Sequence, residues 1–270
     1  MLLCDLTLPT PEENLACDEA LLDLCEAGGA DELLRFWEPT QYFVVVGYAN
    51  HVETEVNIPF CRQNSIPVLR RCSGGGTVLQ GPGCLNYALV LRIDESGPRR
   101  SIAATNHFIL DRHQAALREL LVARVEKQGQ TDLAINGLKF SGNSQRRRKN
   151  FLLFHGTFLL ELDIDLIQKA LPLPSKEPDY RLRRPHVDFL MNLKVAPQSV
   201  KSALLRLWEA SEPLAEVPLG QIAQLVREKY GQPYSQEDCQ SSRQRCSGHN
   251  QSGENEGEYH VIPKFIGEAP

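Results

Sequence analysis

Residues 66–91 read IPVLRRCSGGGTVLQGPGCLNYALVL, and this stretch decides the fold. Runs of β-branched and aliphatic residues precede the triple glycine, follow it, and resume after a Gly-Pro-Gly turn. Short apolar runs bounded by turn residues are typical of β-strands. The stretch therefore predicts strands at 66–71, 77–79 and 85–91, with a glycine loop between the first two.

Helical patterns lie on both sides of this stretch. Thr10-Pro11-Glu12-Glu13 has an N-cap residue, a proline in the first turn and a glutamate three residues after the cap, and Gly28-Gly29 follows as a stop signal. These residues predict an amphipathic helix over about 11–27. Apolar residues at helical spacing predict a second long helix at 101–124 and two more at about 198–210 and 218–230.

Further β-rich runs complete the pattern. The runs at 33–37 and 42–46 are separated by Glu38-Pro39-Thr40 and predict the start of a sheet. Asn136-Gly137 between two apolar runs is a strong hairpin signal, and a second hairpin is expected to turn at 146–150 and return along 151–162. The fold class expected is α+β, a mixed β-sheet with flanking helices.

Composition restricts the kind of protein. The chain has 270 residues, is 42% hydrophobic and 23% charged, and carries a net charge of −5, which argues against general nucleic-acid binding. It has no uninterrupted apolar run of membrane-spanning length, and no pattern typical of a secretory leader. Its eight cysteines form no CxxC pair and no metal-type spacing. We therefore expect a soluble cytoplasmic protein with no membrane partner and no protein-held metal.

The glycine loop is the first candidate for chemistry. Three consecutive glycines let backbone N–H groups approach a ligand closely, which suits a phosphate or carboxylate, and Arg70 and Arg71 would add charge-assisted contacts. A plain flexible turn with solvent-facing arginines is the alternative. The loop lacks the Gly-Lys-Ser/Thr ending of a P-loop and precedes a strand, so neither nucleotide hydrolysis nor a dinucleotide fold is favoured.

Two further stretches carry polar groups beside small residues. Lys139 is followed by Ser-Gly-Asn-Ser, which leaves room for a ligand, so its charge is suited to hold the carboxylate and α-phosphate oxygens of an acyl-adenylate. A solvated edge lysine is the alternative. His155 lies within an apolar strand, where a satisfied core histidine is the commoner case. The basic residues at 146–149 are expected to form a solvated turn, or a docking point for an acidic carrier protein.

In this order, the three stretches resemble the lipoate–protein ligase family of the biotin/lipoate ligase superfamily. The family pattern is Arg-Arg-x-x-Gly-Gly-Gly-x-Val, then Asp-Leu and Lys-x-Ser-Gly-x-x-x-Arg, then His-Gly-Thr-Leu. Here these motifs stand at Arg70–Val78, at Asp132-Leu133 and Lys139–Arg146, and at His155-Gly156-Thr157. An Asn-Leu-Ala-x-(Asp/Glu)-Glu segment also matches at Asn14–Glu19, and the resemblance covers about residues 1–195.

The resemblance implies a class II biotin/lipoate ligase-like catalytic domain over 1–195. The two helical patterns that follow predict a small C-terminal helical segment at 196–234, and the polar composition after Tyr234 predicts a flexible tail at 235–270. It implies that ATP and lipoate or octanoate give an acyl-AMP, with Mg²⁺ on the phosphates, and that a lysine of a lipoyl carrier accepts the acyl group. The carriers implied are lipoyl domains of 2-oxoacid dehydrogenases and the glycine-cleavage H protein. Lys139 would be the catalytic residue. The residues implied to bind ATP or lipoyl-AMP are Arg71, Gly75, Gly76, Thr77, Val78, Leu79 and Lys139, and further substrate-binding candidates are Arg70, Ser73, Asn86, Asp132, Ser141, Gly142, His155 and Gly156.

Departures from the family pattern keep alternatives open. Gln80-Gly81 replaces a common His-Asp pair, and Gly47-Tyr48-Ala49-Asn50 lacks an arginine that many ligases have. A cysteine-dependent octanoyl- or lipoyl-transferase is the close alternative, although 125–131 contains no cysteine, which leaves Cys72 and Cys84 as nucleophile candidates. A non-catalytic lipoyl-binding module is the alternative from another class.

Overall fold

The computed structural model describes residues 1–232, which belong to one compact unit. The tail expected at 235–270 lies outside the described residues, as do Cys239 and Cys246. Within residues 1–232, no helix is both long enough and apolar enough to cross a membrane.

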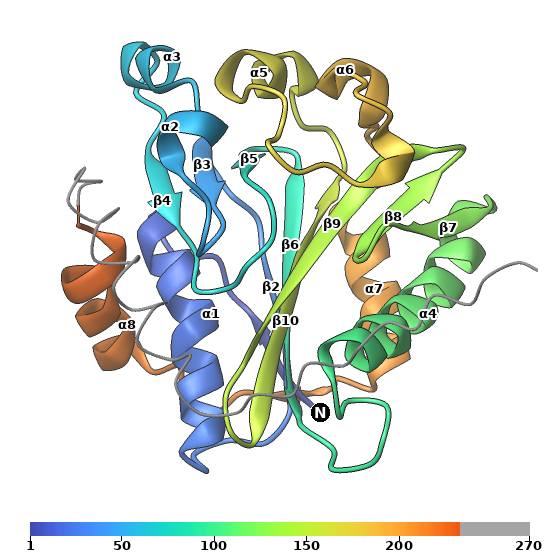
Figure 1. The fold of residues 1–270 in the computed structure, drawn as a ribbon. Coiled ribbons are helices and arrows are strands. Elements are labelled where there is room, and N and C mark those ends of the chain that lie inside the picture. The colour runs from blue at the N-terminus through green and yellow to red at the C-terminus, as the bar shows by residue number, and fades with distance from the viewer. Residues whose placement is uncertain (233–270) are drawn as a thin grey trace, which may run out of the picture. The chain divides into compact units, whose positions relative to one another are not determined.

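An eight-stranded mixed sheet forms the centre, in the order β11-β1-β2-β6-β10-β9-β8-β7 (Figure 1). Its strands are β1 (Leu2–Asp5), β2 (Leu33–Trp37), β6 (Cys84–Arg92), β7 (Val125–Gln128), β8 (Asp132–Ile135), β9 (Leu138–Arg147), β10 (Phe151–Leu159) and β11 (Glu212–Pro213). Strand β1 pairs in parallel with β2 and β11, and all other pairs are antiparallel. The mixed α+β sheet expected from the sequence is confirmed.

A second sheet of three strands carries the glycine loop. It has the order β4-β3-β5, with β3 at Phe43–Val46, β4 at Val68–Arg70 and β5 at Val78–Gln80. The expectation that 33–37 and 42–46 begin one sheet is wrong, because β2 pairs with β1 and β6 whereas β3 pairs with β4 and β5. An apolar run identifies a strand but not its partner, and the partner here is chosen by contacts distant in sequence.

Helices cover both faces of the large sheet. The helices are α1 (Pro11–Glu26), α2 (Val52–Glu55), α3 (Ile58–Gln63), α4 (Ile102–Leu121), α5 (Ile164–Ala170), η1 (Asp179–Arg181), α6 (His186–Phe189), α7 (Pro197–Trp208), α8 (Leu219–Leu225) and the π-helical turn η2 (Val226–Tyr230). Figure 1 shows α1 and α8 on one side and α4 and α7 on the other. The two helices of the segment 196–234 thus lie on opposite faces of the sheet.

Local signals predicted the ends of these elements well. Thr10 and Glu13 form the complete capping box of α1, and Thr10 has the extended backbone of an N-cap. Asn136 and Gly137 have φ of 51° and 73°, the left-handed pair that a tight type I′ hairpin requires, and the β8–β9 hairpin is confirmed.

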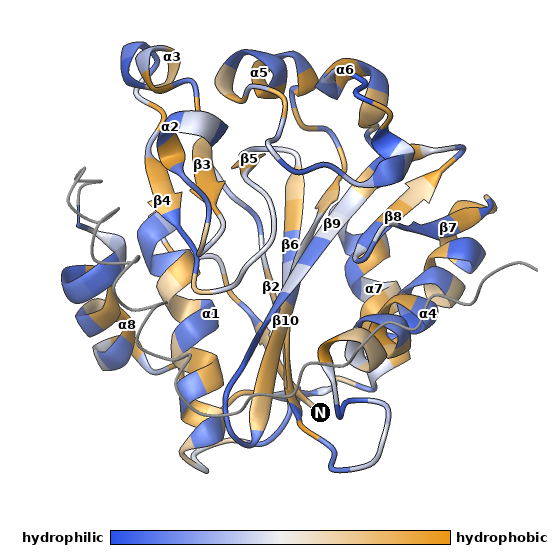
Figure 2. Ribbon diagram, viewed as in Figure 1, coloured by the Kyte–Doolittle hydropathy of each residue, from blue (hydrophilic) through white to orange (hydrophobic). Residues whose placement is uncertain are grey.

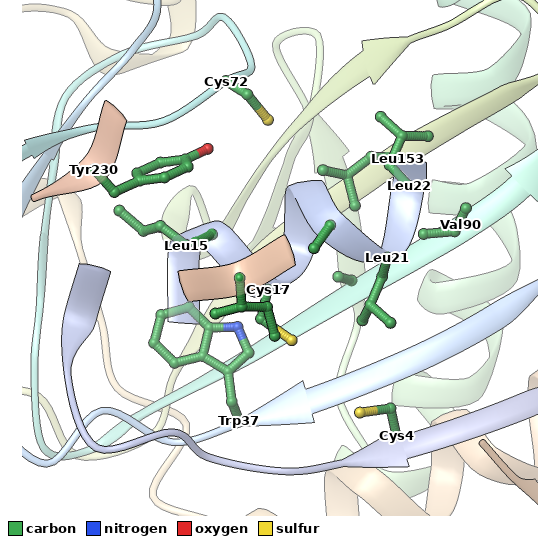
Figure 3. Close-up of a cluster of buried hydrophobic side chains, with 14 of the residues drawn as sticks. Cys4, Leu15, Cys17, Leu21, Leu22, Trp37, Cys72, Val90, Leu153 and Tyr230 are labelled. Carbon is green, nitrogen blue, oxygen red and sulfur yellow. The ribbon is translucent and has the colours of Figure 1, made fainter. Parts of the chain in front are cut away.

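Two apolar clusters fill the faces of the sheet. The cluster under α1 contains Ala88, Val90 and Leu153 from the sheet, and Figure 3 shows Tyr230 of η2 near Leu15 and Cys72 at one end of it. The cluster under α4 and α7 is built on the opposite-facing residues of β6 and β10. In Figure 2 the apolar colour is strong on β6, whereas β9 is largely hydrophilic. Strand β9 therefore brings polar side chains into the middle of the sheet.

Candidate active site

Strand register places the polar residues of β6, β9 and β10 in rows. His155 pairs with Ser144 on β9 and with Ala88 on β6, and residues directly opposite one another in a sheet point to the same face. One pleat further along, Thr157 pairs with Gly142 and Asn86. These two rows lie on the face that α1 covers, and Gly142 and Ala88 keep side-chain bulk low there.

The glycine loop between β4 and β5 is fixed through its carbonyl groups. The buried guanidinium of Arg71 donates to the carbonyls of Gly74 at 2.6 Å and Gly76 at 2.7 Å. Ser144 Oγ donates to the Gly74 carbonyl at 2.8 Å, and Asn50 Nδ2 donates to the Gly75 carbonyl at 3.1 Å. Within residues 1–232, the N–H groups of Gly74, Gly75 and Gly76 donate to no protein acceptor. The loop therefore has its acceptors engaged and three donors available to an anion.

Backbone conformation at Gly75 and close packing at Gly47 explain why both positions are glycine. Gly75 has φ of +85°, a conformation that side chains rarely adopt. A Cβ on Gly47 would lie 2.1 Å from the Gly75 carbonyl oxygen, so the preceding loop touches the glycine loop backbone to backbone.

Arg70 and Arg71 donate hydrogen bonds to backbone carbonyls of the neighbouring loops instead of pointing into solvent. Arg70 Nη1 donates to the carbonyls of Gly47, Tyr48 and Asn50, at 2.8 to 3.0 Å. Burial lowers the pKa of Arg71 to about 10, and its guanidinium donates to loop carbonyls and to Ser73 Oγ. The alternative of solvent-facing arginines is wrong, because both side chains organise the loops around the site.

Ser73, His155 and Asp18 form a hydrogen-bonded chain beneath the glycine loop. Ser73 Oγ lies 2.6 Å from His155 Nε2, and His155 Nδ1 lies 3.1 Å from Asp18 Oδ2. Arg35 is fully buried and contacts the other oxygen of Asp18. Burial favours a raised pKa for Asp18, but the charge of Arg35 and the hydrogen bond from His155 outweigh it and lower this pKa. An ionised Asp18 accepts from Nδ1–H, which leaves Nε2 to accept from the Ser73 hydroxyl.

Lys139 lies on the same face as the glycine loop. Its Nζ is 2.8 Å from Asp132 Oδ1, and Tyr180 donates from its hydroxyl to Asp132 Oδ2 at 2.8 Å. A Cβ on Gly142 would lie 2.8 Å from Lys139 Nζ, so the ammonium group rests over that position. Ser144, which bonds to the glycine loop, is the next residue of β9 on this face, and such neighbours are about 7 Å apart. Strand β9 is interior to the sheet, so the alternative of a solvated edge lysine is wrong.

Three polar side chains close a ring beside Lys139. Asn86 donates to Gln80 Oε1 at 2.8 Å, Gln80 donates to Thr157 Oγ1 at 2.7 Å, and Thr157 donates to Asn86 Oδ1 at 2.5 Å. Gln80 is one of the positions where the chain departs from the common ligase pattern. Its side chain bonds to Thr157, the cross-strand partner of Gly142, and to Asn86 on the next strand, and so holds both in place.

The remaining predicted residues lie in different places. Thr77 Oγ1 is within 3.5 Å of Asn50, whereas Val78 and Leu79 pack in the apolar clusters. Ser141 pairs with Phe158, and a Cβ on Gly156 would meet Asn143 on the face that α4 covers. The Ser141 side chain, and any side chain placed at Gly156, would therefore lie on the face away from the glycine loop.

The basic turn at 146–149 is also better anchored than a solvated turn. Arg147 donates to the Arg99 carbonyl at 2.8 Å, and Arg148 pairs with Asp23 at 2.8 Å. Arg146 lies 5.7 Å from the ring of Tyr48, in cation–π geometry. The expectation of a solvated turn is wrong for Arg147 and Arg148, because the hairpin packs against α1 and the loop before α4.

The cysteines nearest the site are poor nucleophiles. Cys72 and Cys84 are buried, and burial raises the pKa of each thiol to about 12. The thiolate is the reactive form, so neither side chain is activated. Cys84 contributes to the apolar cluster around β3 and α5, which accounts for its presence by packing.

Several site residues escaped the sequence reasoning. Asp18 stands inside the Asn14–Glu19 segment that was noted for its resemblance, but its partner His155 is 137 residues away. Ser144 and Tyr180 gave no signal of their own. They enter the site only because the β9–β10 hairpin and the η1 turn bring them next to the glycine loop and Asp132.

Comparisons with known proteins identify the family of the chain. The family model described as the lipoyl protein ligase A/B catalytic domain matches residues 10–206. The chain is 25% identical over 233 residues to octanoyltransferase LipM of Brevibacillus brevis, covering 77% of this chain and 81% of that protein. It is 26% identical over 214 residues to lipoate-protein ligase LplJ of Bacillus subtilis, covering 77% of this chain and 62% of that protein.

Two solved structures share the fold with a TM-score of 0.72. One is a bi-partite lipoate protein ligase from Thermoplasma acidophilum, described with its E2 lipoyl domain, at 23% identity over 86% of this chain and 93% of that chain. The other is a lipoate-protein ligase A bound with ATP, at 24% identity over 86% of this chain and 96% of that chain. The chain belongs to the lipoyl protein ligase A/B catalytic domain family, and its fold is that of class II biotin/lipoate ligases.

Proposed function

We propose that the protein is a lipoate–protein ligase. It activates lipoate or octanoate with ATP to acyl-AMP and transfers the acyl group to a lysine of a lipoyl carrier domain. One observation carries this proposal. The glycine loop offers three unpaired amides beside Ser144, and the ammonium group of Lys139 lies over Gly142, the next residue of β9 on the same face. An acyl phosphate has anionic oxygens and a polarised carbonyl, and these two features need an amide cradle and a nearby cation.

The roles of the site residues follow from their contacts. Gly74–Gly76 amides bind the phosphate, while Arg71, Asn50 and Ser144 hold the loop in shape for it. Lys139 neutralises charge on the acyl carbonyl and phosphate oxygens as the acyl group leaves. Asp132 fixes the direction of the ammonium before the substrate arrives. A prearranged cation stabilises developing charge more than water does, because it needs no reorganisation.

The partners proposed are lipoyl domains of 2-oxoacid dehydrogenases and the glycine-cleavage H protein. Support for the first comes from the Thermoplasma acidophilum ligase, which is described with an E2 lipoyl domain. Mg²⁺ would enter with the phosphates of ATP, which is how this ion usually binds in nucleotide sites. Within residues 1–232, no three His, Cys, Asp or Glu side chains gather as a metal site, so the ion would depend on the substrate for its ligands.

A transferase is the second candidate, since relatives named octanoyltransferases match the chain as well as ligases do. Such an enzyme takes the acyl group from a carrier thioester without ATP. A cysteine-based version is disfavoured by the high pKa values of Cys72 and Cys84.

The deciding experiment incubates the full chain with ATP, Mg²⁺, lipoate and a lipoyl domain, followed by mass spectrometry of lipoyl-AMP and of the carrier lysine. We expect both products with wild type and at least a 100-fold loss in Lys139→Ala, an effect typical of losing one transition-state charge contact. Lys127→Ala is the matched control. Lys127 lies on the edge strand β7 and pairs with Asp111 of α4, so this substitution should leave activity unchanged. Full activity of Lys139→Ala, or lipoylation from free lipoate that does not need ATP, would overturn the proposal.

A further inference from the structure

The buried chain Ser73–His155–Asp18 has no task in the adenylation and transfer described above. Ser73 is 1% exposed and is directly continuous with the glycine loop, and the two hydrogen bonds of the chain measure 2.6 and 3.1 Å. We propose that Ser73 is a nucleophile, activated by His155 and Asp18, which accepts an acyl group from a thioester and passes it to the carrier lysine without ATP. The proposal rests on the proposed function only for the identity of the final lysine acceptor.

The direction of the proton is set by the charges around the chain. Arg35 and His155 keep Asp18 ionised, so Asp18 accepts from His155 Nδ1–H. His155 then presents a lone pair at Nε2, 2.6 Å from Ser73 Oγ, which is the distance for a general base acting on a serine hydroxyl. A nucleophile, a base and an orienting carboxylate in hydrogen-bond reach are recognised by this geometry on unrelated folds.

Two neighbouring groups would stabilise the charge that this chemistry creates. Arg71 Nε donates to Ser73 Oγ at 3.1 Å and favours negative charge on that oxygen. The N–H groups of Gly74, Gly75 and Gly76 follow Ser73 directly and have no protein acceptor in the described chain. Amides next to a nucleophile are the usual donors to the oxyanion of an acyl-transfer intermediate.

The reaction has two balanced steps. In the first, Ser73 Oγ attacks the thioester carbonyl while its proton moves to His155 Nε2. The C–S bond breaks, and the leaving sulfur takes that proton, which gives a free thiol and a Ser73 ester. In the second, the lysine amine attacks the ester, the C–O bond breaks, and the amine proton passes through His155 back to Ser73 Oγ, which leaves an amide on the carrier.

Access to Ser73 depends on the loop above it. Ser73 is buried whereas the adjoining Gly74–Gly76 are exposed, so we infer that these glycines are its cover. Side chains of Asn50, Arg71 and Ser144 hold this cover by hydrogen bonds to its carbonyls. The acyl donor therefore reaches Ser73 only when the cover lifts. Lifting the cover breaks five hydrogen bonds from these three side chains, and glycine tolerates the new backbone angles.

The choice of serine also fits the cysteines. The transferases that resemble this chain use a cysteine, but each of the six cysteines in the described chain is buried. Ser73 is the hydroxyl nucleophile that a base already contacts at the glycine loop.

The test treats the purified full chain with octanoyl-N-acetylcysteamine in the absence of ATP. Released thiol and the intact mass are measured over time after acid quench, and the modified residue is identified by peptide mapping. We expect one thiol per chain in a burst and an octanoyl group on Ser73. Ser73→Ala should abolish both signals, and His155→Gln, which retains hydrogen bonding but transfers no proton, should slow the burst about 10²- to 10⁴-fold. Cys72→Ala is the matched control for the adjacent nucleophile and should keep the adduct. Thermal unfolding of each variant confirms that it is folded.

A further variant separates nucleophilic attack from mere positioning. Ser73→Cys keeps a nucleophile at the same place, so it should form a hydroxylamine-sensitive thioester, whereas a purely structural serine would form no adduct in either version. No burst in wild type, or an unchanged burst in Ser73→Ala, would overturn the relay. ATP-dependent lipoylation without any burst refutes the relay but leaves the ligase proposal standing. A Ser73 adduct without ATP-dependent lipoylation supports the relay and refutes the ligase proposal.

Discussion

Lys139 Nζ lies 2.8 Å from Asp132 Oδ1, and the second oxygen of Asp132 accepts a hydrogen bond from Tyr180. A residue from the η1 turn thus orients the carboxylate that orients the lysine. The lysine side chain is 23% exposed, so solvent screens the ion pair and its contribution to stability is small. The main effect of the ion pair is to fix the position of the Lys139 ammonium group.

We therefore expect Asp132→Asn to reduce lipoylation more than it reduces stability. Loss of the charged partner lets Lys139 sample other directions and should lower kcat/KM about tenfold, which corresponds to about 1.4 kcal/mol of transition-state stabilisation. Tyr180→Phe removes a hydrogen bond to the carboxylate and should lower the free energy of unfolding by about 1.5 to 3 kcal/mol. Steady-state kinetics and urea unfolding of both variants measure these effects. Unchanged kcat/KM in Asp132→Asn would contradict the orienting role.

Backbone contact between Gly47 and Gly75 gives a second prediction. Gly47→Ala places a methyl group 2.1 Å from the Gly75 carbonyl, so the glycine loop must move away. We expect KM for ATP to rise at least tenfold, because the loop that carries the three unpaired amides is displaced. Gly220→Ala on α8 is the control, because a Cβ there meets nothing within 4 Å. Equal KM values in the two variants would show that the loop shape does not matter for nucleotide binding.

His113 gives a prediction about pH. It is fully buried in α4 and accepts a hydrogen bond from Trp208 Nε1, and burial, assisted by the charge of Arg112, lowers its pKa to about 3. The unfolded chain binds a proton here near pH 6.5, whereas the folded chain remains neutral until about pH 3. The protein is thus fully stable with respect to this group above pH 6.5. As pH falls from 6.5 toward 3, the free energy of unfolding decreases by at most about 1.4 kcal/mol per pH unit.

His113→Gln should remove this slope between pH 6 and 4 while keeping an acceptor for Trp208. Denaturant unfolding at several pH values measures it. His107→Gln, an exposed position on the same helix, should keep the wild-type slope. Parallel stability curves for wild type and His113→Gln would exclude the buried neutral histidine as the cause.

The last prediction concerns thiol chemistry. Burial raises the pKa of Cys17, Cys25, Cys72 and Cys84 to about 12. At pH 8 about one such thiol in 10⁴ is ionised, so alkylation should be very slow in the folded chain. In a variant with Cys239 and Cys246 changed to serine, we expect no modification by iodoacetamide at pH 8 until urea is added, and full activity after the treatment. If mass spectrometry instead detected rapid alkylation of Cys72 or Cys84, the result would support a cysteine-dependent transferase.

Local sequence determined the elements and the candidate loop. The capping box at Thr10 and Glu13 fixed the start of α1, and Asn136-Gly137 fixed the β8–β9 turn, because these signals act between residues a few positions apart. The glycine run predicted a backbone donor site, and the motif order predicted the family that the comparison later showed.

Tertiary structure alone decided which of these groups meet. Asp18 and His155 are 137 residues apart, Ser144 and Gly74 are 70 apart, and each pair is brought together by sheet register and by the packing of α1. Contacts with the 47–50 loop turned Arg70 inward, and long-range strand pairing separated β2 from β3 into two sheets. A sequence pattern reports propensity over a few residues, whereas these choices depend on which distant surfaces bury each other most completely.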